Sequence, residues 1–184
     1  MLAFLGWAPQ STLGAHCMGL PDLYSYGGAK GMKNPTGPWD LMAAASKAGG
    51  FLGWHRHKLK WLDAKRKTYV VKGKHRFELT PLNAPSGVSM ITVPVNDPAN
   101  PSKVFVVEIA QPIRNLGKVG SVTGVLVYSV DATLATGLNA VVVYPKIDLL
   151  HASFEPGDLF EHKEAPLSVK VLKKNEDGSY LIEL

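Results

Sequence analysis

Two residues near the start of the chain, His16 and Asp22, are of the types that bind transition-metal ions. They lie in the stretch LGAHCMGLPD, in which Gly19 falls between them and predicts a turn. A helix that ends near this glycine would let the chain turn back and bring both side chains to one place. An imidazole nitrogen and a carboxylate oxygen are both good zinc ligands, so the pair predicts part of a metal site.

The positions one helical turn before His16 do not complete such a site. Zinc hydrolases of the HExxH type place two histidines four residues apart on one helix face, with a glutamate base after the first histidine. Here Thr12 stands four residues before His16, and Leu13 follows it. A threonine hydroxyl is a poor zinc ligand and leucine cannot act as a base. The sequence therefore offers two protein ligands and no general base, and we expect no catalysis.

The sequence segments around these residues resemble those of a known family. GLPDLYSY is followed by GPWDLMAA and then by FLGWHRHKLKWLD, and in this order they resemble the immune-inhibitor-A-like family of secreted zinc metalloproteases. Farther along, VFVVEIAQ, GVLVYSVD and FEPGDLF are similar to the β-domain of that family in order and approximate spacing. The resemblance covers roughly residues 13–184.

The resemblance implies a role for each matching residue. His16 corresponds to the second zinc histidine, Asp22 to the third ligand, and Met42 to the Met-turn residue, which packs beneath the metal without binding it. Tyr24 and Tyr26 follow Asp22 and are candidate substrate contacts. The family further implies zinc as cofactor, a peptide or protein as substrate and a secreted location. Because the first zinc histidine and the glutamate are absent, we interpret the chain as a fragment or degenerate homologue of a zinc-dependent metalloendopeptidase, a pseudoenzyme.

The start of the chain departs from the family. About 11 residues precede Thr12, whereas the parent enzymes need an upstream half-domain there, so we expect a truncated or misjoined beginning. The segment MLAFLGWAPQSTLGA has no basic residue before its apolar stretch and is not a convincing signal peptide. Without the upstream half, apolar surface in residues 1–66 would lack its cover, and self-association through it is expected.

The pattern of apolar residues divides the chain into two zones. Residues 1–66 predict a partial metalloprotease catalytic subdomain, with one short helix in WDLMAAASKAG that stops at Gly49 and Gly50 and another along GFLGWHRHKLKWL. From residue 67 the period changes to two, and residues 67–184 contain eight candidate strands: KTYVV, HRFELT, VSMITVPV, KVFVVEIAQ, GVLVYSVD, NAVVVYP, LSVKVLKK and SYLIEL. The expected fold class is α+β, with a helical and loop remnant of a zincin catalytic domain followed by an antiparallel β-sandwich.

Charge and composition leave other functions open. The formal net charge is +5, and much of it comes from the segment between His55 and Arg76, which holds nine basic residues against the single acid Asp63. We interpret this segment as a solvated face and expect no nucleic-acid partner, although such a surface remains an alternative. His55 and His57 point apart if they lie on a helix, so they are not expected to chelate a metal together. No apolar run is long enough to span a membrane.

A function without catalysis is the main alternative. The β-sandwich predicted for residues 67–184 could serve as a binding module for protein or glycan, and the helices before it would then only cap the sheets. An exposed aromatic platform on the sheet domain would favour this alternative.

Overall fold

The computed structural model describes residues 7–27, 33–111, 123–163 and 165–184, and within the first helix it describes side chains from Thr12 onward. Two α-helices and two 3-10 turns come before the strands: α1 (Trp7–Cys17), η1 (Gly37–Trp39), α2 (Gly53–Lys58) and η2 (Ala64–Arg66). The strands are β1 (Lys67–Tyr69), β2 (Arg76–Leu79), β3 (Met90–Pro94), β4 (Lys103–Ile109), β5 (Val125–Asp131), β6 (Val141–Val143), β7 (Leu159–Glu161), β8 (Ser168–Lys174) and β9 (Tyr180–Glu183).

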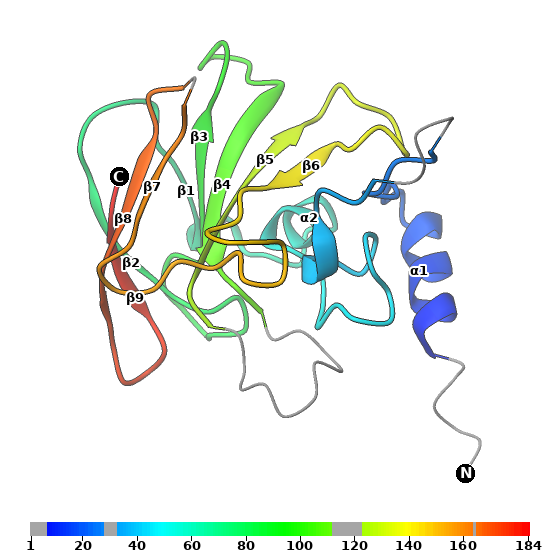
Figure 1. Ribbon diagram of the computed structural model, residues 1–184, viewed down its shortest axis with the longest axis horizontal. Helices are drawn as coiled ribbons and strands as arrows, with labels where there is room; N and C mark the ends of the chain where they lie inside the picture. Colours follow the sequence, from blue (N-terminus) through cyan, green and yellow to red (C-terminus); the bar gives the residue numbers. More distant parts are fainter. Residues whose placement is uncertain (1–6, 28–32, 112–122, 164) are drawn as a thin grey trace.

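These strands form two sheets, so the protein is a mixed α+β structure that consists mostly of sheet. Sheet A has the order β1-β3-β4-β5-β6, and sheet B has the order β2-β9-β8-β7 (Figure 1). The ladders are antiparallel except for β1 and β3, which run parallel with Lys67 opposite Met90. The exception follows from the chain path: after β1 the chain crosses to sheet B to form β2, and it returns to sheet A in the direction of β1.

Sheet A is buried on both faces. Along β4, Val104 and Val106 belong to a cluster with the residues of the first zone, whereas Phe105 and Val107 belong to a cluster with the residues of sheet B. Successive strand residues point to opposite faces, so an uninterrupted apolar run is what a strand with two covered faces requires. Sheet A is therefore a middle layer, with the helices and loops of residues 7–66 on one face and sheet B on the other.

All eight predicted strands are present, with somewhat shorter bounds. A tight turn at Asp177 and Gly178 joins the last two strands, and Gly178 adopts a φ of +82° there. Strand β7 was not predicted, because the segment FEPGDLF entered the sequence interpretation only through its similarity to the family's β-domain. It has three residues, of which only Phe160 is buried, so it shows too little alternation to be recognised.

The helix predicted in WDLMAAASKAG was wrong. This segment forms separate turns, because the carboxylate of Asp40 accepts the backbone N–H of Met42 at 2.8 Å and that of Leu52 at 2.7 Å. Both bonds hold the segment as a closed loop. The second predicted helix, along GFLGWHRHKLKWL, is shorter than predicted. Helix α2 ends at Lys58, and Lys60 has a φ of +60°. No helix in the described residues is long and apolar enough to cross a membrane.

A buried carboxylate from sheet A positions the start of α2. Glu108 on β4 accepts the N–H of Gly53 with both oxygens, at 3.1 and 2.8 Å, and the hydroxyl of Tyr128 at 2.8 Å. The Tyr128 oxygen in turn accepts the N–H of Trp54 at 3.2 Å. The first backbone donors of a helix have no partner within it, so this network satisfies them from the neighbouring sheet. Burial raises the pKa of Glu108 to about 8.

Candidate metal centre

The end of α1 brings the first candidate ligand into position. Gly19 has a φ of +85°, a left-handed conformation that glycine adopts without steric cost. Its N–H bonds the carbonyl of His16 at 2.9 Å, while the N–H of Leu20 bonds the carbonyl of Ala15 at 3.1 Å. These two bonds form a Schellman motif, which ends the helix and turns the chain back beneath it. Gly19 therefore forms the turn that the sequence predicted for it.

His16 and Asp22 meet across this turn. The distance between His16 Nε2 and Asp22 Oδ1 is 3.2 Å, and the His16 side chain is 39% exposed. His16 Nδ1 lies 2.9 Å from the carbonyl oxygen of Leu20. Because a carbonyl only accepts, Nδ1 carries a proton, and Nε2 carries a second one only in the charged ring. In the charged ring Nε2 donates to Asp22 Oδ1 and the two groups form an ion pair, whereas in the neutral ring the Nε2 lone pair faces the carboxylate and a cation between the two groups would be stabilised.

The loop between β5 and β6 fixes the other side of Asp22. Thr136 Oγ1 accepts the backbone N–H of Asp22 at 2.9 Å. The hydroxyl of Tyr26 donates to Asp22 Oδ2 at 2.8 Å and also lies 2.9 Å from Thr136 Oγ1. Asp22 Oδ1 thus faces His16 while Oδ2 is held by a phenol. Hydrogen bonds of this kind orient a carboxylate that could bind a metal.

The remaining predicted site residues lie close by. Met42 is buried in the first cluster, and its carbonyl accepts the N–H of Leu23, the residue after Asp22, at 3.1 Å. Tyr24 and Tyr26 make an edge-to-face ring contact with centroids 6.0 Å apart. Burial, followed by the nearby Asp22 carboxylate, raises the pKa of Tyr24. The structure thus brings all five predicted residues into one region, and their roles there stay predictions.

The donor set does not fit a complete zinc site. A tetrahedral zinc would hold a nitrogen and an oxygen ligand roughly 3.3 Å apart, which agrees with the His16–Asp22 separation. Catalytic zinc sites use three protein ligands, however, and the described residues contain no group of three or more His, Cys, Asp or Glu that could hold a metal. Thr12 and Leu13 both lie on α1, one turn before His16 and Cys17. We therefore derive no reaction step through zinc.

Comparisons with known proteins give no relative. No family model, curated protein or solved structure matches this chain. The resemblance to the metalloprotease family therefore rests on the residues quoted above and stays a prediction.

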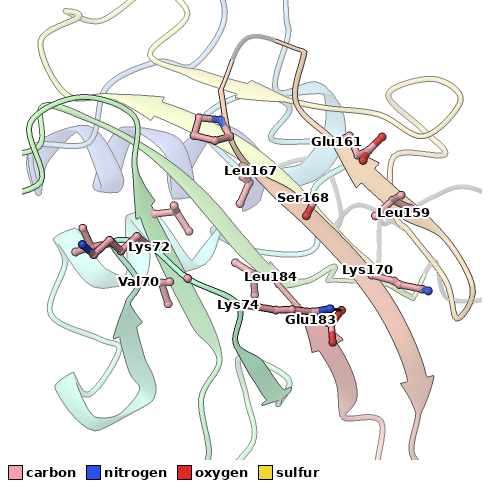
Figure 2. Close-up of a pocket in the computed structure, with 14 residues that line it drawn as sticks. Val70, Lys72, Lys74, Leu159, Glu161, Leu167, Ser168, Lys170, Glu183 and Leu184 are labelled. Carbon is pink, nitrogen blue, oxygen red and sulfur yellow. Dashed lines mark ion pairs between the residues drawn. The ribbon is translucent and has the colours of Figure 1, made fainter.

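A pocket of about 470 Å³ lies away from this pair, between the segment after β1 and strands β7 to β9 (Figure 2). Lys72, Lys74 and Lys170 border it together with apolar side chains such as Leu167. Figure 2 shows Lys74 directed at Glu183, to which it is bonded at 2.8 Å. With acids beside its lysines, the pocket presents mixed charge and selects no single class of ligand.

A second hollow, of about 530 Å³, is bordered by aromatic rings. The rings of Tyr144 and His162 meet edge to face with centroids 5.2 Å apart, and the Phe160 ring lies 5.6 Å from that of Tyr144. Contacting rings form a continuous apolar floor, and Lys163 and Glu161 also border the hollow. Such a mixture of apolar surface and a few polar groups is typical of ligand sites.

Several residues of the basic segment have partners inside the protein. Arg56 donates to Gln111 at 2.7 Å, and Arg66 donates to the carbonyl of Pro81 at 2.8 Å. Lys67 bonds the ring of His57, whose pKa is lowered by burial and then by the nearby lysines Lys67 and Lys58. Arg56, Arg66 and Lys67 therefore form hydrogen bonds within the protein. The expectation of no nucleic-acid partner nevertheless stays a prediction.

Two features of this region were not found from the sequence. Thr136 lies 114 residues after Asp22, and nothing in its surroundings indicated the contact. His55 and Asp40 form a buried pair, with His55 Nδ1 3.1 Å from Asp40 Oδ1 and 3.0 Å from Oδ2. The sequence indicated no partner for His55, because Asp40 lies 15 residues before it. The structure separates His55 from His57, as expected, and gives each its own partner.

Proposed function

We propose that this chain is a catalytically silent relative of the zinc metalloendopeptidases of the immune-inhibitor-A-like type. In this proposal residues 1–66 are the remnant of a zincin catalytic domain, and residues 67–184 are a β-sandwich domain. The observation that carries the proposal is the convergence of His16 and Asp22, whose nearest atoms are 3.2 Å apart. A helix, a glycine turn and a returning carboxylate are the arrangement that the family pattern requires for its second and third ligands.

The same geometry supports the prediction that the chain is silent. Position 12 would supply the missing ligand from the same face of α1 as His16, since residues four apart lie one above the other on a helix. Threonine and leucine at positions 12 and 13 supply neither a strong ligand nor a base. Loss of a base alone costs on the order of 10²–10⁴ in rate.

The first experiment measures peptide hydrolysis by the purified full chain with added zinc. We expect turnover no faster than the buffer control, with and without a chelator. A chelator-sensitive rate that His16→Ala abolishes would contradict the silence of the chain.

A second experiment restores what is missing. Thr12→His places a third donor one turn before His16, and we expect it to raise zinc affinity by more than about tenfold in calorimetric titration. The control is Gly14→His, which puts a histidine on the same helix two residues before His16, where the side chains point about 200° apart. Equal affinities of the two variants would contradict the proposed ligand positions.

A binding function of the sheet domain is the second candidate, and the aromatic hollow favours it. The rings of Tyr144, Phe160 and His162 give the domain an apolar floor to which a protein side chain or a sugar ring could bind. A screen of glycans and peptides against the full chain tests this candidate. Tyr144→Ala should weaken the binding of any ligand found, while His16→Ala should leave the affinity for that ligand unchanged.

A further inference from the structure

His55, whose ring is bonded to the buried Asp40, borders a pocket that the proposed function does not use. The pocket, here called the His55 pocket, has a volume of about 260 Å³ and lies between the turn after α1, helix α2 and the loop from β5 to β6. Its walls are largely apolar and include Leu20, Leu23, Val130 and Val141. Its lining residues on α2, β5 and β6 place it on the face of sheet A that the first zone covers.

Asp40 fixes the orientation and the tautomer of His55. Both carboxylate oxygens of Asp40 lie within 3.1 Å of His55 Nδ1, and each also accepts a backbone N–H, from Met42 and from Leu52. A carboxylate only accepts when it is ionised, so Nδ1 of the ring carries a proton. In the neutral ring the other nitrogen, Nε2, is then a hydrogen-bond acceptor.

Nε2 of His55 has no hydrogen-bond partner among the described residues, and the His55 pocket is a space that this residue borders. Among the described residues, the only polar side-chain atom that is both fully buried and without a hydrogen-bond partner is Asn139 Oδ1. The hydrogen bonds of the described residues include none for His55 Nε2, so this nitrogen must reach solvent-accessible space. The His55 pocket is the space that this side chain, which is only 2% exposed, borders.

The buried acceptor of His55 and the apolar side chains around it favour a particular kind of ligand, while the other polar side chains that border the pocket, those of Lys58, Asp131 and Thr136, are exposed or half-buried. A ligand that fills the pocket without donating a hydrogen bond leaves the acceptor desolvated and unpaired, which costs free energy. A ligand with an apolar body and one donor at its end avoids this cost. The volume fits one substituted ring rather than a larger ligand.

We propose that the His55 pocket binds a phenolic ring, with the phenol hydroxyl donating to Nε2 of His55 and the ring packed against the apolar walls. The ring is either a tyrosine side chain of a peptide or a free phenol. Exposed Lys58 and half-buried Asp131 border the mouth, where they can reach the polar groups of a peptide backbone. The site needs no zinc, so its test is independent of the proposed metal centre.

The experiment titrates the full chain, labelled with ¹⁵N-histidine, with p-cresol and with toluene. We expect p-cresol to shift the Nε2 resonance of His55 in a saturable way, and to bind about tenfold more tightly than toluene. Equal binding of the two compounds, or no saturable shift with p-cresol, overturns the proposal. N-acetyl-tyrosinamide distinguishes the sources, because tighter binding than p-cresol indicates a peptide and weaker binding a free phenol.

A variant at the rim keeps the test independent of the buried pair. Ala135 is exposed and borders the pocket, so Ala135→Phe should fill the mouth and abolish p-cresol binding without disturbing the fold. The matched control is Ala99→Phe, at an exposed alanine that does not border the pocket. Retained binding by Ala135→Phe, or equal loss in both variants, contradicts the site.

Discussion

At the scale of single residues, buried ionisable side chains decide how the first zone attaches to sheet A. Glu108 is fully buried, and the donors around it, Tyr128 and Gly53, only partly offset the cost of burying a charge. Its pKa in the folded protein is about 8, far above that of an exposed glutamate. A glutamate on a strand usually faces water. Here Glu108 instead acts as a cap for the first backbone N–H groups of α2.

This burial predicts a pH dependence of stability. Between about pH 4.5 and 8 the carboxyl group of Glu108 is ionised in the unfolded chain but protonated in the folded one, so folding binds a proton. The contribution of Glu108 to stability is therefore greatest below about pH 4.5, and it falls by at most about 1.4 kcal/mol per pH unit until about pH 8. Denaturant titrations over this range should show a flatter profile for Glu108→Gln.

The control for this measurement is Glu161→Gln, which changes an exposed glutamate on β7. Its stability profile should follow that of the unchanged chain. A Glu108→Gln profile as steep as the original would show that Glu108 does not titrate in this window.

At the scale of elements, α1 and α2 differ in what surrounds their glycines. A Cβ on Gly53 would lie closer to Glu108 Oε2 than real Cβ atoms approach, and it would also press on Leu82. Gly14 on α1 has no atom within 4 Å of the same position. Close contact with the sheet, rather than helix propensity, therefore determines the residue at the start of α2.

Replacing each glycine by alanine should have opposite effects. We expect Gly53→Ala to lower the free energy of unfolding by about 1–3 kcal/mol, because it displaces the buried carboxylate. Gly14→Ala should raise the free energy of unfolding by about 0.5–1 kcal/mol, because alanine is the better helix former. Thermal and denaturant unfolding measure both, and equal effects of the two substitutions would contradict the close approach at Gly53.

At the scale of the whole molecule, the shared cluster links the two predicted domains. Leu23 and Met42 from the first zone pack with Val106 and Leu126 from sheet A. Removing residues 1–66 would expose this face of the sheet to water. The division at residue 66 stays a prediction, and the cluster predicts that neither part is stable without the other.

Cooperative unfolding tests this link with two signals. All four tryptophans, at positions 7, 39, 54 and 61, lie in the first zone, whereas most strands lie after it. Tryptophan fluorescence therefore follows the first zone, and far-ultraviolet circular dichroism follows mainly the sheets. We expect both transitions to have the same midpoint. An earlier fluorescence transition would instead show that the first zone unfolds by itself.

The sequence by itself determined the strands other than β7 and one turn of the site. Alternation and continuous apolar runs depend only on which faces of a strand are covered, so β4 and β5 could be recognised as central strands. The left-handed Gly19 was predictable because few other residues adopt that conformation. The convergence of His16 and Asp22 followed from that turn.

Only the tertiary structure decided what these elements contact. Asp40 replaced a predicted helix by turns, because its carboxylate binds the backbone N–H groups of Met42 and of Leu52, which lies 12 residues farther along the chain than Asp40. Glu108 caps a helix 55 residues away, and Thr136 holds an aspartate 114 residues away. Local patterns carry no record of such contacts, since a hydrogen bond depends on distance in space and not on separation in the chain.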